Sequence, residues 1–416
     1  MKLYKIALRN IVRNKRRSLL SASAIAVAGF TIVFLFGLLA GMVDDMEDNL
    51  FTYLTGAVRV RNAGYDRYER LNPLHLSLPD YESLLDEIRS DPAVSAVSPR
   101  ISFPGRVPIG GISSDEKVNV MGTGVDFSLE QKYQDYERTL IRGRLPESGS
   151  REALLGRALA EKLGIDIGGK FTVLSTSGTR GSNAYTFTVT GILALPIPGL
   201  ERTTVQIPLD TAQRFLWLPA QVQEIFIKVD EKISSPKELA ARLPESLSSG
   251  VPLSVLSYKQ INGMAGMIDL AVKIYDLIAV IFFLLGSTVI INTTIMVIFE
   301  RMKEIGTLGA LGMTGKQLVR LFFLEALFIS IAGALFGIFI GMGITAYYGT
   351  VGFTAMEKAM DGMDSMGLGS IMYPVLNFKS TVMVFIYSLI VTGIATWWPS
   401  RRAAKIAPVD ALRGGF

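Results

Sequence analysis

Side chains that carry out bond chemistry are scarce in this sequence. Its 416 residues include no cysteine and one histidine, His75, which lies between Pro73 and Pro79. Without cysteine, a thiolate site cannot form. A single histidine is too few for a histidine-based metal cluster and argues against a catalytic triad. The scattered carboxylates show no metal-ligand or triad spacing. We therefore predict no catalytic residue, no bound metal, no cofactor and no enzyme activity on this chain.

The segment nearest to a nucleotide-binding loop is Gly309-Ala-Leu-Gly312-Met-Thr-Gly315-Lys316-Gln317. Its glycine spacing is off by one residue, and Gln317 replaces the hydroxyl that would hold magnesium. The segment also lacks the preceding strand that such a loop requires. If the protein uses ATP, the ATP and magnesium are therefore bound by a separate polypeptide.

The same region predicts a docking element. Residues 300–312 read Glu-Arg-Met-Lys-Glu-Ile-Gly-Thr-Leu-Gly-Ala-Leu-Gly. A short helix would place Ile305, Leu308 and Leu311 on one side and charged residues on the other. A polar partner with an apolar notch would fit this helix. A solvated hairpin would explain the charges, but it would not explain the small and apolar residues.

Methionines form another group of candidates. A surface for apolar substrate contact would consist of Met42, Met264, Met267, Met356, Met360 and Met363. Flexible thioethers suit varied apolar ligands, such as acyl chains. Packing at the base of an external domain explains the same residues, and we favour that interpretation. A copper(I) site is disfavoured because no histidine accompanies the cluster.

Four apolar runs must position these candidates. They are Leu19–Val43, Leu277–Phe299, Ala326–Tyr348 and Ser380–Ser400. A helix needs about 20 apolar residues to cross the hydrocarbon core, which each run roughly provides. We assign transmembrane helices to residues 19–43, 271–299, 321–348 and 380–398. The first run is longer than the h-region of a signal peptide, so we interpret it as an uncleaved anchor.

Basic residues predict the orientation. Residues 1–18, 300–320 and 399–416 hold 15 of the 42 basic residues but only 3 of the 37 acidic residues. The positive-inside rule therefore places both termini and the 300–320 loop in the cytoplasm. The remainder of the chain is net acidic, which leaves no basic patch for nucleic acid.

Residues 1–18 predict a cytoplasmic interfacial helix on membrane lipid. Tyr4, Leu8, Ile11 and Val12 would share one face of this helix, with basic residues around them. A charged flank that only orients the first span is the alternative, and both interpretations can hold together.

The predicted fold is an α-helical four-span bundle with a large extracytoplasmic α+β domain, residues 44–270, inserted between the first and second spans. Strand-like runs are Ala57–Arg61, Lys170–Thr176, Tyr185–Leu193 and Glu224–Val229, and short helices are predicted over Ala158–Leu163, Leu209–Leu216 and Pro236–Leu247. We expect an inserted subdomain at about residues 123–217. The remaining segments are a cytoplasmic coupling-helix loop (300–320), a small extracytoplasmic loop (349–379) and a cytoplasmic tail (399–416).

Glycines within the spans predict close helix packing. Gly333, Gly337 and Gly341 recur every four residues in the third span, and Gly37 and Gly41 lie in the first. Small residues let helices approach closely, either within one subunit or between two subunits. Helices that pack tightly can move as rods.

Acidic residues are nearly absent from the spans. Glu325 lies within a turn of the cytoplasmic end of the third span, where we expect its side chain to snorkel. No series of ionisable residues marks an ion pathway. The spans are therefore predicted to transmit motion rather than to conduct.

Three stretches resemble signatures of the permease family that includes MacB, FtsX and the lipoprotein-release subunits LolC and LolE. They are Ala7–Leu19, Arg301–Gly312 and Pro399–Arg413, and within the insertion Leu155–Gly168 and Val189–Ile192 are also similar. The resemblance covers essentially the whole chain and agrees with the one-plus-three arrangement of spans in that family. One departure is Gly309, where relatives commonly carry a basic residue.

The resemblance implies partners and a mechanism. Relatives act as dimers of four-span permeases with two copies of a cytoplasmic ABC ATPase, whose closure is transmitted through the helices to the extracytoplasmic domains. A second permease, identical or paralogous, is therefore implied. The residues implied to contact the ATPase are Glu300, Arg301, Glu304, Ile305, Gly306, Leu308, Ala310, Leu311, Arg401 and Arg402.

The length of the chain and its lack of a fused ATPase are most similar to the lipoprotein-release permeases of the bacterial inner membrane. The implied activity is release of lipoproteins toward the outer membrane, with lipoprotein or other extracytoplasmic cargo and a periplasmic carrier as partners. Export of peptides or antibiotics, as by MacB, and regulation of a cell-wall hydrolase, as by FtsX, stay open as alternatives.

Overall fold

The computed structural model describes residues 3–69, 72–109, 116–261, 264–353 and 372–403. The chain divides into a helical unit (1–45, 270–356 and 371–416) and an α+β unit (46–269 and 357–370). In the described residues, four helices are long and apolar enough to cross a membrane. The predicted fold class, a four-span bundle with a large inserted α+β domain, is therefore confirmed.

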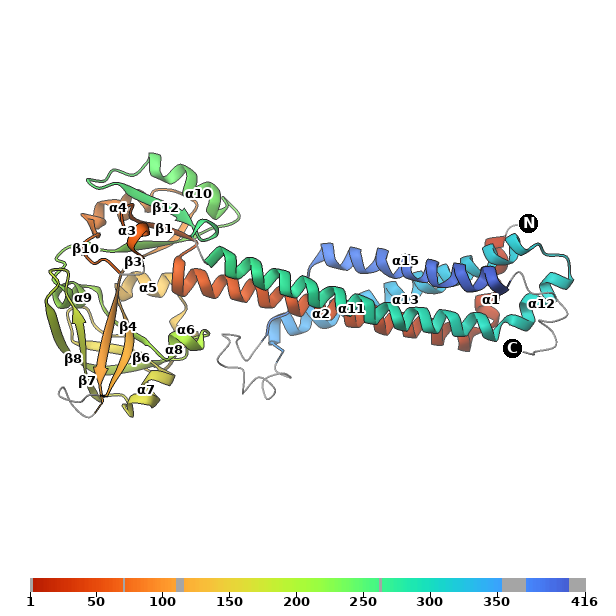
Figure 1. The fold of residues 1–416 in the computed structure, drawn as a ribbon, viewed down its shortest axis with the longest axis horizontal. Coiled ribbons are helices and arrows are strands. Elements are labelled where there is room, and N and C mark those ends of the chain that lie inside the picture. Colours follow the sequence, from red (N-terminus) through yellow and green to blue (C-terminus); the bar gives the residue numbers. More distant parts are fainter. Residues whose placement is uncertain (1–2, 70–71, 110–115, 262–263, 354–371, 404–416) are drawn as a thin grey trace. The chain divides into compact units, whose positions relative to one another are not determined.

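The helical unit consists of long helices that run alongside one another (Figure 1). Its elements are α1 (Leu3–Arg13), α2 (Lys15–Leu50), α11 (Met264–Glu300), α12 (Met302–Ala310), α13 (Gly315–Val351) and α15 (Phe378–Ala403). All four long helices extend beyond the predicted spans, because hydropathy reports the length matched to lipid and not the whole helix. For example, α2 continues past Asp44 and Asp45 to Leu50, where a π-helical turn, Phe51–Thr55, follows.

Hydroxyl groups connect the helices of the bundle. The hydroxyls of Ser330 on α13 and Thr392 on α15 lie 3.0 Å apart. Tyr387 on α15 donates to the carbonyl of Phe283 on α11 at 2.8 Å, and its hydroxyl also contacts that of Ser287. Among apolar helices, such bonds fix which faces meet.

A ten-stranded mixed sheet forms the α+β unit, in the order β12-β1-β11-β3-β4-β9-β6-β8-β5, with β7 paired to β3 and β8. The strands are β1 (Val58–Asn62), β3 (Val94–Pro108), β4 (Lys117–Val125), β5 (Leu140–Gly143), β6 (Glu152–Gly156), β7 (Lys170–Thr176), β8 (Ser182–Leu193), β9 (Thr204–Pro208), β11 (Glu224–Val229) and β12 (Leu253–Ser257). A separate pair consists of β2 (Leu78–Pro79) and β10 (Gln221–Val222).

Short helices flank this sheet. They are α3 (Tyr65–Tyr68), α4 (Tyr81–Arg89), α5 (Phe127–Tyr133), α6 (Tyr136–Thr139), α7 (Arg157–Leu163), α8 (Pro198–Glu201), α9 (Leu209–Leu216) and α10 (Pro236–Arg242). Capping side chains explain where α5, α6 and α10 begin. At α10, for example, Ser235 and Glu238 form a reciprocal capping box and Pro236 occupies the first turn.

Residues 123–217, where we predicted an inserted subdomain, lie within the α+β unit, and the bounds of that subdomain stay a prediction. β3 pairs with β11 through residues 94–100 and with β4 through residues 100–108, so one sheet joins the two regions. One apolar core also includes Leu84 and Ile88 of α4 together with Phe171 and Phe187 of β7 and β8. The segment therefore shares both its sheet and its core with the flanking chain.

Candidate functional site

The hairpin between α11 and α13 is the candidate site. Arg301 alone separates α11 from α12, and α12 ends at Ala310, with Leu311 as its C-cap. The following turn passes through Gly312, whose φ of +91° is rarely adopted by residues with a side chain. α13 then begins with a capping box, in which the Thr314 amide donates to Gln317 Oε1 at 3.0 Å. The sequence thus defines the hairpin at both ends.

The predicted ATPase contacts differ in exposure. Leu311 is 79% exposed, whereas Leu308 is half-buried and Gly306 is buried. The side chain of Ile305 lies outside the described residues. The remaining exposed members are Glu300, Ala310 and Arg401, and Glu304 is half-buried. Contact of these residues with an ATPase stays a prediction, and among the described side chains of this set Leu311 offers the most accessible apolar surface for it.

A buried carboxylate lies at the base of the hairpin. Glu325 on α13 is 2% exposed, and Arg301 at the start of the hairpin is 5% exposed. The two side chains form an ion pair. The Asn10 amide on α1 donates to Glu325 Oε1 at 2.6 Å, and the Arg301 guanidinium lies 5.4 Å from the centroid of the Phe322 ring. Three segments far apart in sequence therefore meet at one carboxylate.

This arrangement corrects our expectation for Glu325. We expected its side chain to snorkel toward water at the end of the third span. Because α13 begins at Gly315, Glu325 instead lies about 15 Å inside the helix. Burying an unpaired carboxylate would cost several kcal/mol, so Arg301 and Asn10 replace the water that the side chain loses.

Arg301 has a function inside the chain that its sequence position did not indicate. Its guanidinium faces Glu325, and its Nε also lies 3.6 Å from Glu304 Oε2. Direct contact of this side chain with an ATPase stays a prediction. Within the chain, Arg301 fixes the first turn of α12 to α13.

The end of α15 supplies the other predicted contacts. The Arg401 guanidinium lies 5.3 Å from the centroid of the Trp397 ring. This stacking holds the charge at an exposed position. The side chain of Arg402 lies outside the described residues.

The span glycines are close contacts between helices of the same chain. A Cβ atom added at Gly337 on α13 would lie 2.2 Å from the Ala26 carbonyl oxygen of α2, and one at Gly333 would lie 2.6 Å from that of Ala22. The further helix contacts are Gly341 against Val33 and Gly37 against Thr345, whereas Gly41 lies against the carbonyl of Tyr373, which precedes α15. Of the two arrangements left open by the sequence, these contacts are packing within one subunit.

The methionine candidates are not brought together in the described residues. Met42 is half-buried on α2. Met264 and Met267 lie in α11, but their side chains are outside the described residues, as are Met356, Met360 and Met363 altogether. Substrate contact by any of them stays a prediction.

A second site, at the far end of α2, was missed by sequence reasoning. In the π-helical turn, the Phe51 carbonyl accepts from the Tyr133 hydroxyl at 2.9 Å, and the Thr52 carbonyl accepts from Arg100 Nη2 at 3.0 Å. Arg100 is itself buried and pairs with Glu130 at 2.5 Å. Burial raises the pKa of Tyr133, so its hydroxyl stays protonated and donates. These bonds therefore hold the π-helical turn to the rest of the α+β unit.

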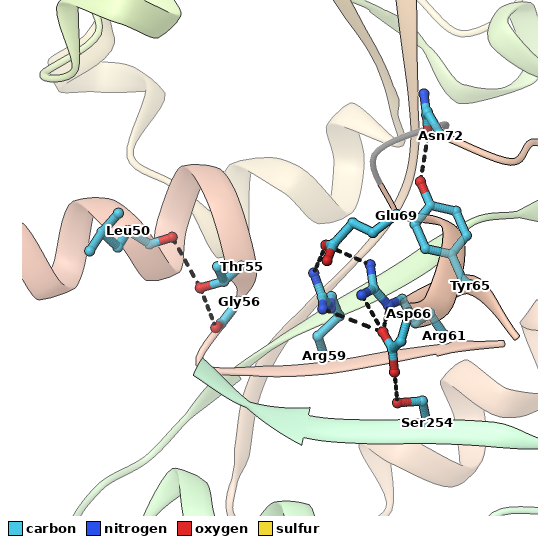
Figure 2. A network of polar contacts seen from close by, with 10 residues as sticks. All are labelled: Leu50, Thr55, Gly56, Arg59, Arg61, Tyr65, Asp66, Glu69, Asn72 and Ser254. Carbon is cyan, nitrogen blue, oxygen red and sulfur yellow. Dashed lines mark hydrogen bonds and ion pairs between the residues drawn. The ribbon is translucent and has the colours of Figure 1, made fainter. Parts of the chain in front are cut away.

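Figure 2 shows how the chain continues from α2 into β1. Thr55 bonds the carbonyls of Leu50 and Gly56, and Gly56 turns the chain with a φ of +71°. Three residues after Gly56, Arg59 begins a network in which it and Arg61 pair with Asp66 and Glu69.

The network ties β1 to α3. Arg61 Nη1 lies 3.0 Å and Arg59 Nη1 3.3 Å from Glu69 Oε1. Burial raises the pKa of Glu69, but the hydrogen bond and charge of Arg61 outweigh it, so this pKa lies below its ordinary value. The signal in the sequence was the pair of arginines within a predicted strand, because buried charges require partners.

Two family descriptions match the chain. The MacB-like periplasmic core domain matches residues 18–245, and the FtsX-like permease C-terminal region matches residues 277–408. The first match alone spans more than half of the chain. The chain belongs to the MacB/FtsX permease family. It is an ABC transporter permease of the LolC/LolE, MacB and FtsX type and a multi-pass inner-membrane protein, as the resemblance predicted.

Individual relatives of this permease are distant in sequence. The lipoprotein-releasing system transmembrane protein LolC of Neisseria meningitidis serogroup B is 22% identical, over 80% of this chain and 81% of the relative. The macrolide export ATP-binding/permease protein MacB of Bdellovibrio bacteriovorus is 24% identical, over 97% of this chain and 60% of the relative. The crystal structure of the periplasmic region of MacB from Actinobacillus actinomycetemcomitans is 15% identical, with a TM-score of 0.34, and covers 53% of this permease and 96% of that chain.

Proposed function

We propose that this permease transmits ATP hydrolysis by a separate cytoplasmic ATPase to its α+β unit, and that its cargo is lipoprotein. The chain would work with two ATPase copies and a second permease, with both termini in the cytoplasm and the α+β unit in the periplasm. ATP and magnesium would bind only to the ATPase.

The proposal rests on contacts within the helical unit and on one continuous helix. The hairpin is fixed to α13 through Arg301 and Glu325, and α13 lies against the backbone of α2 at Gly337. α2 runs without a break to Leu50, and in the turn that follows it the Phe51 carbonyl accepts from the Tyr133 hydroxyl. Close packing resists compression, so a displacement of the hairpin would be passed along this path.

The name of a relative supports lipoprotein as cargo. A LolC protein, named for a lipoprotein-releasing system, matches 80% of this chain over 81% of its own length. MacB-like export of peptides or antibiotics is the alternative, because the match to MacB spans 97% of this chain.

Reconstitution with the co-purifying ATPase tests the proposal. Proteoliposomes that contain a lipidated protein should release it to a soluble carrier when ATP is added, and the lipidated protein should stimulate ATP hydrolysis. The same protein without its acyl chains is the matched control. If neither form stimulates hydrolysis while a peptide or macrolide does, the cargo assignment is wrong and the export alternative holds.

A further inference from the structure

Helix α1 presents two exposed stripes of different chemistry. Tyr4, Leu8 and Val12, which are 45%, 45% and 62% exposed, follow one line because residues four apart share a helix face. The neighbouring line is basic and exposed, and consists of Lys5, Arg9 and Arg13. An apolar stripe beside a basic stripe is typical of a helix that lies in a lipid headgroup layer.

Two observations identify anionic lipid as the surface that α1 contacts. No acidic residue occurs between positions 3 and 18, whereas exposed basic residues are frequent there. In addition, α2 begins at Lys15, directly after the turn at Asn14, so the following membrane span keeps α1 at the membrane surface. Each basic residue near an anionic surface strengthens binding roughly fivefold.

The remaining side of α1 faces α13. Ala7 is completely buried, and Asn10, one turn later, donates to the buried carboxylate of Glu325. The other oxygen of this carboxylate pairs with Arg301, the residue that begins the hairpin. A single side chain therefore joins the lipid-facing helix to the base of α12.

We propose that α1 is a sensor of anionic lipid whose position is passed to the hairpin through Asn10, Glu325 and Arg301. When the basic stripe binds anionic headgroups, Asn10 is held against Glu325, and the Arg301 pair holds α12 in one orientation. On neutral lipid α1 is released and the hairpin loses this support. Regulation of the ATPase by lipid then follows, and only that last step rests on the proposed function.

A spin label on the hairpin tests the lipid response without any ATPase. Because the chain has no cysteine, Leu311→Cys gives a single labelling site at a residue that is 79% exposed. The labelled full-length protein is placed in phosphatidylcholine bilayers with and without phosphatidylglycerol. We expect the label to become less mobile when phosphatidylglycerol is present.

Paired variants identify the path. A triple change of Lys5→Gln, Arg9→Gln and Arg13→Gln should abolish the response, whereas the charge-preserving changes Lys5→Arg, Arg9→Lys and Arg13→Lys should keep it. Asn10→Ala should abolish it as well, with the milder Asn10→Ser as a second variant if alanine impairs folding.

Three results would overturn the proposal. They are an unchanged label in the native background, a response that survives loss of the three charges, and a full response in both Asn10 variants. Since no ATPase is present, a wrong assignment of the proposed function would leave these measurements unaffected. That error would instead appear as failure of ATPase co-purification.

Discussion

The carboxylate of Glu325 and the guanidinium of Arg301 form a buried ion pair between α13 and the start of α12. The two residues are not near each other in sequence. The side-chain amide of Asn10 on α1 donates to the same carboxylate, with 2.6 Å between Asn10 Nδ2 and Glu325 Oε1. The pair therefore gives the hairpin a fixed base on α13.

Removing one member of this pair should destabilise the protein more than removing both. Glu325→Leu or Arg301→Leu alone leaves an uncompensated buried charge, at a cost of about 3–5 kcal/mol. The double variant replaces both charges by apolar groups and should recover most of that loss. Thermal unfolding in detergent measures the four proteins of the cycle. Additive losses would show that the two side chains do not act as a pair.

Two glycines on α13 should respond to alanine in opposite ways. Gly337→Ala would place a Cβ atom 2.2 Å from the Ala26 carbonyl oxygen, so α2 and α13 must separate. Gly343→Ala is the matched control, because nothing lies within 4 Å of its added Cβ, and loss of a helical glycine should stabilise by about 0.5–1 kcal/mol. Thermal unfolding of both variants checks this. Equal shifts would contradict the within-subunit contact.

The link between β1 and α3 should depend on acid pH. The pKa of Glu69 is lowered in the folded protein, so its stabilising effect is fully present above the unfolded pKa of about 4.3 and is lost as the pH falls through the folded value. Hydrogen exchange of residues 58–69 in the full-length protein should therefore be slower in the native chain than in Glu69→Gln at neutral pH. This difference should vanish in strong acid. A difference that persists there would refute the pKa assignment.

The bond between the π-helical turn and α5 should be lost when the Tyr133 hydroxyl is removed. Tyr133→Phe deletes only the donor to the Phe51 carbonyl, which should cost about 0.5–1.5 kcal/mol. Exchange of residues 51–55 should rise while exchange of β3 stays unchanged. Tyr68→Phe, at a residue that is 47% exposed, serves as the control and should change neither. Faster exchange throughout the sheet would mean that Tyr133 supports the whole fold instead.

Regular local patterns in the sequence predicted many elements well. The runs at Lys170–Thr176 and Glu224–Val229 are strands and Leu209–Leu216 is a helix with the same bounds in the structure. These segments succeed because their periodicity is uninterrupted and turn residues flank them. The helix expected at Pro236–Leu247 ends earlier, at Arg242, where a 3-10 turn that contains Pro244 begins.

Contacts between distant segments could not be predicted. β3 was missed because Pro99 and Pro104 interrupt it, although both lie in paired positions of the strand. Glu325 was misplaced because hydropathy marks where the apolar run ends, whereas α13 begins at Gly315. The partners of that carboxylate lie more than twenty residues away or at the other end of the chain, and no local pattern signals them.

Hydrogen exchange across the π-helical turn in the assembled transporter tests the central claim, that the hairpin transmits ATP-driven motion to the α+β unit. The native complex and a Glu304→Lys, Leu308→Glu variant are compared with and without ATP, at residues 47–55. We predict that ATP changes protection there in the native protein and has no effect in the variant. An equal ATP response in both proteins would contradict the account.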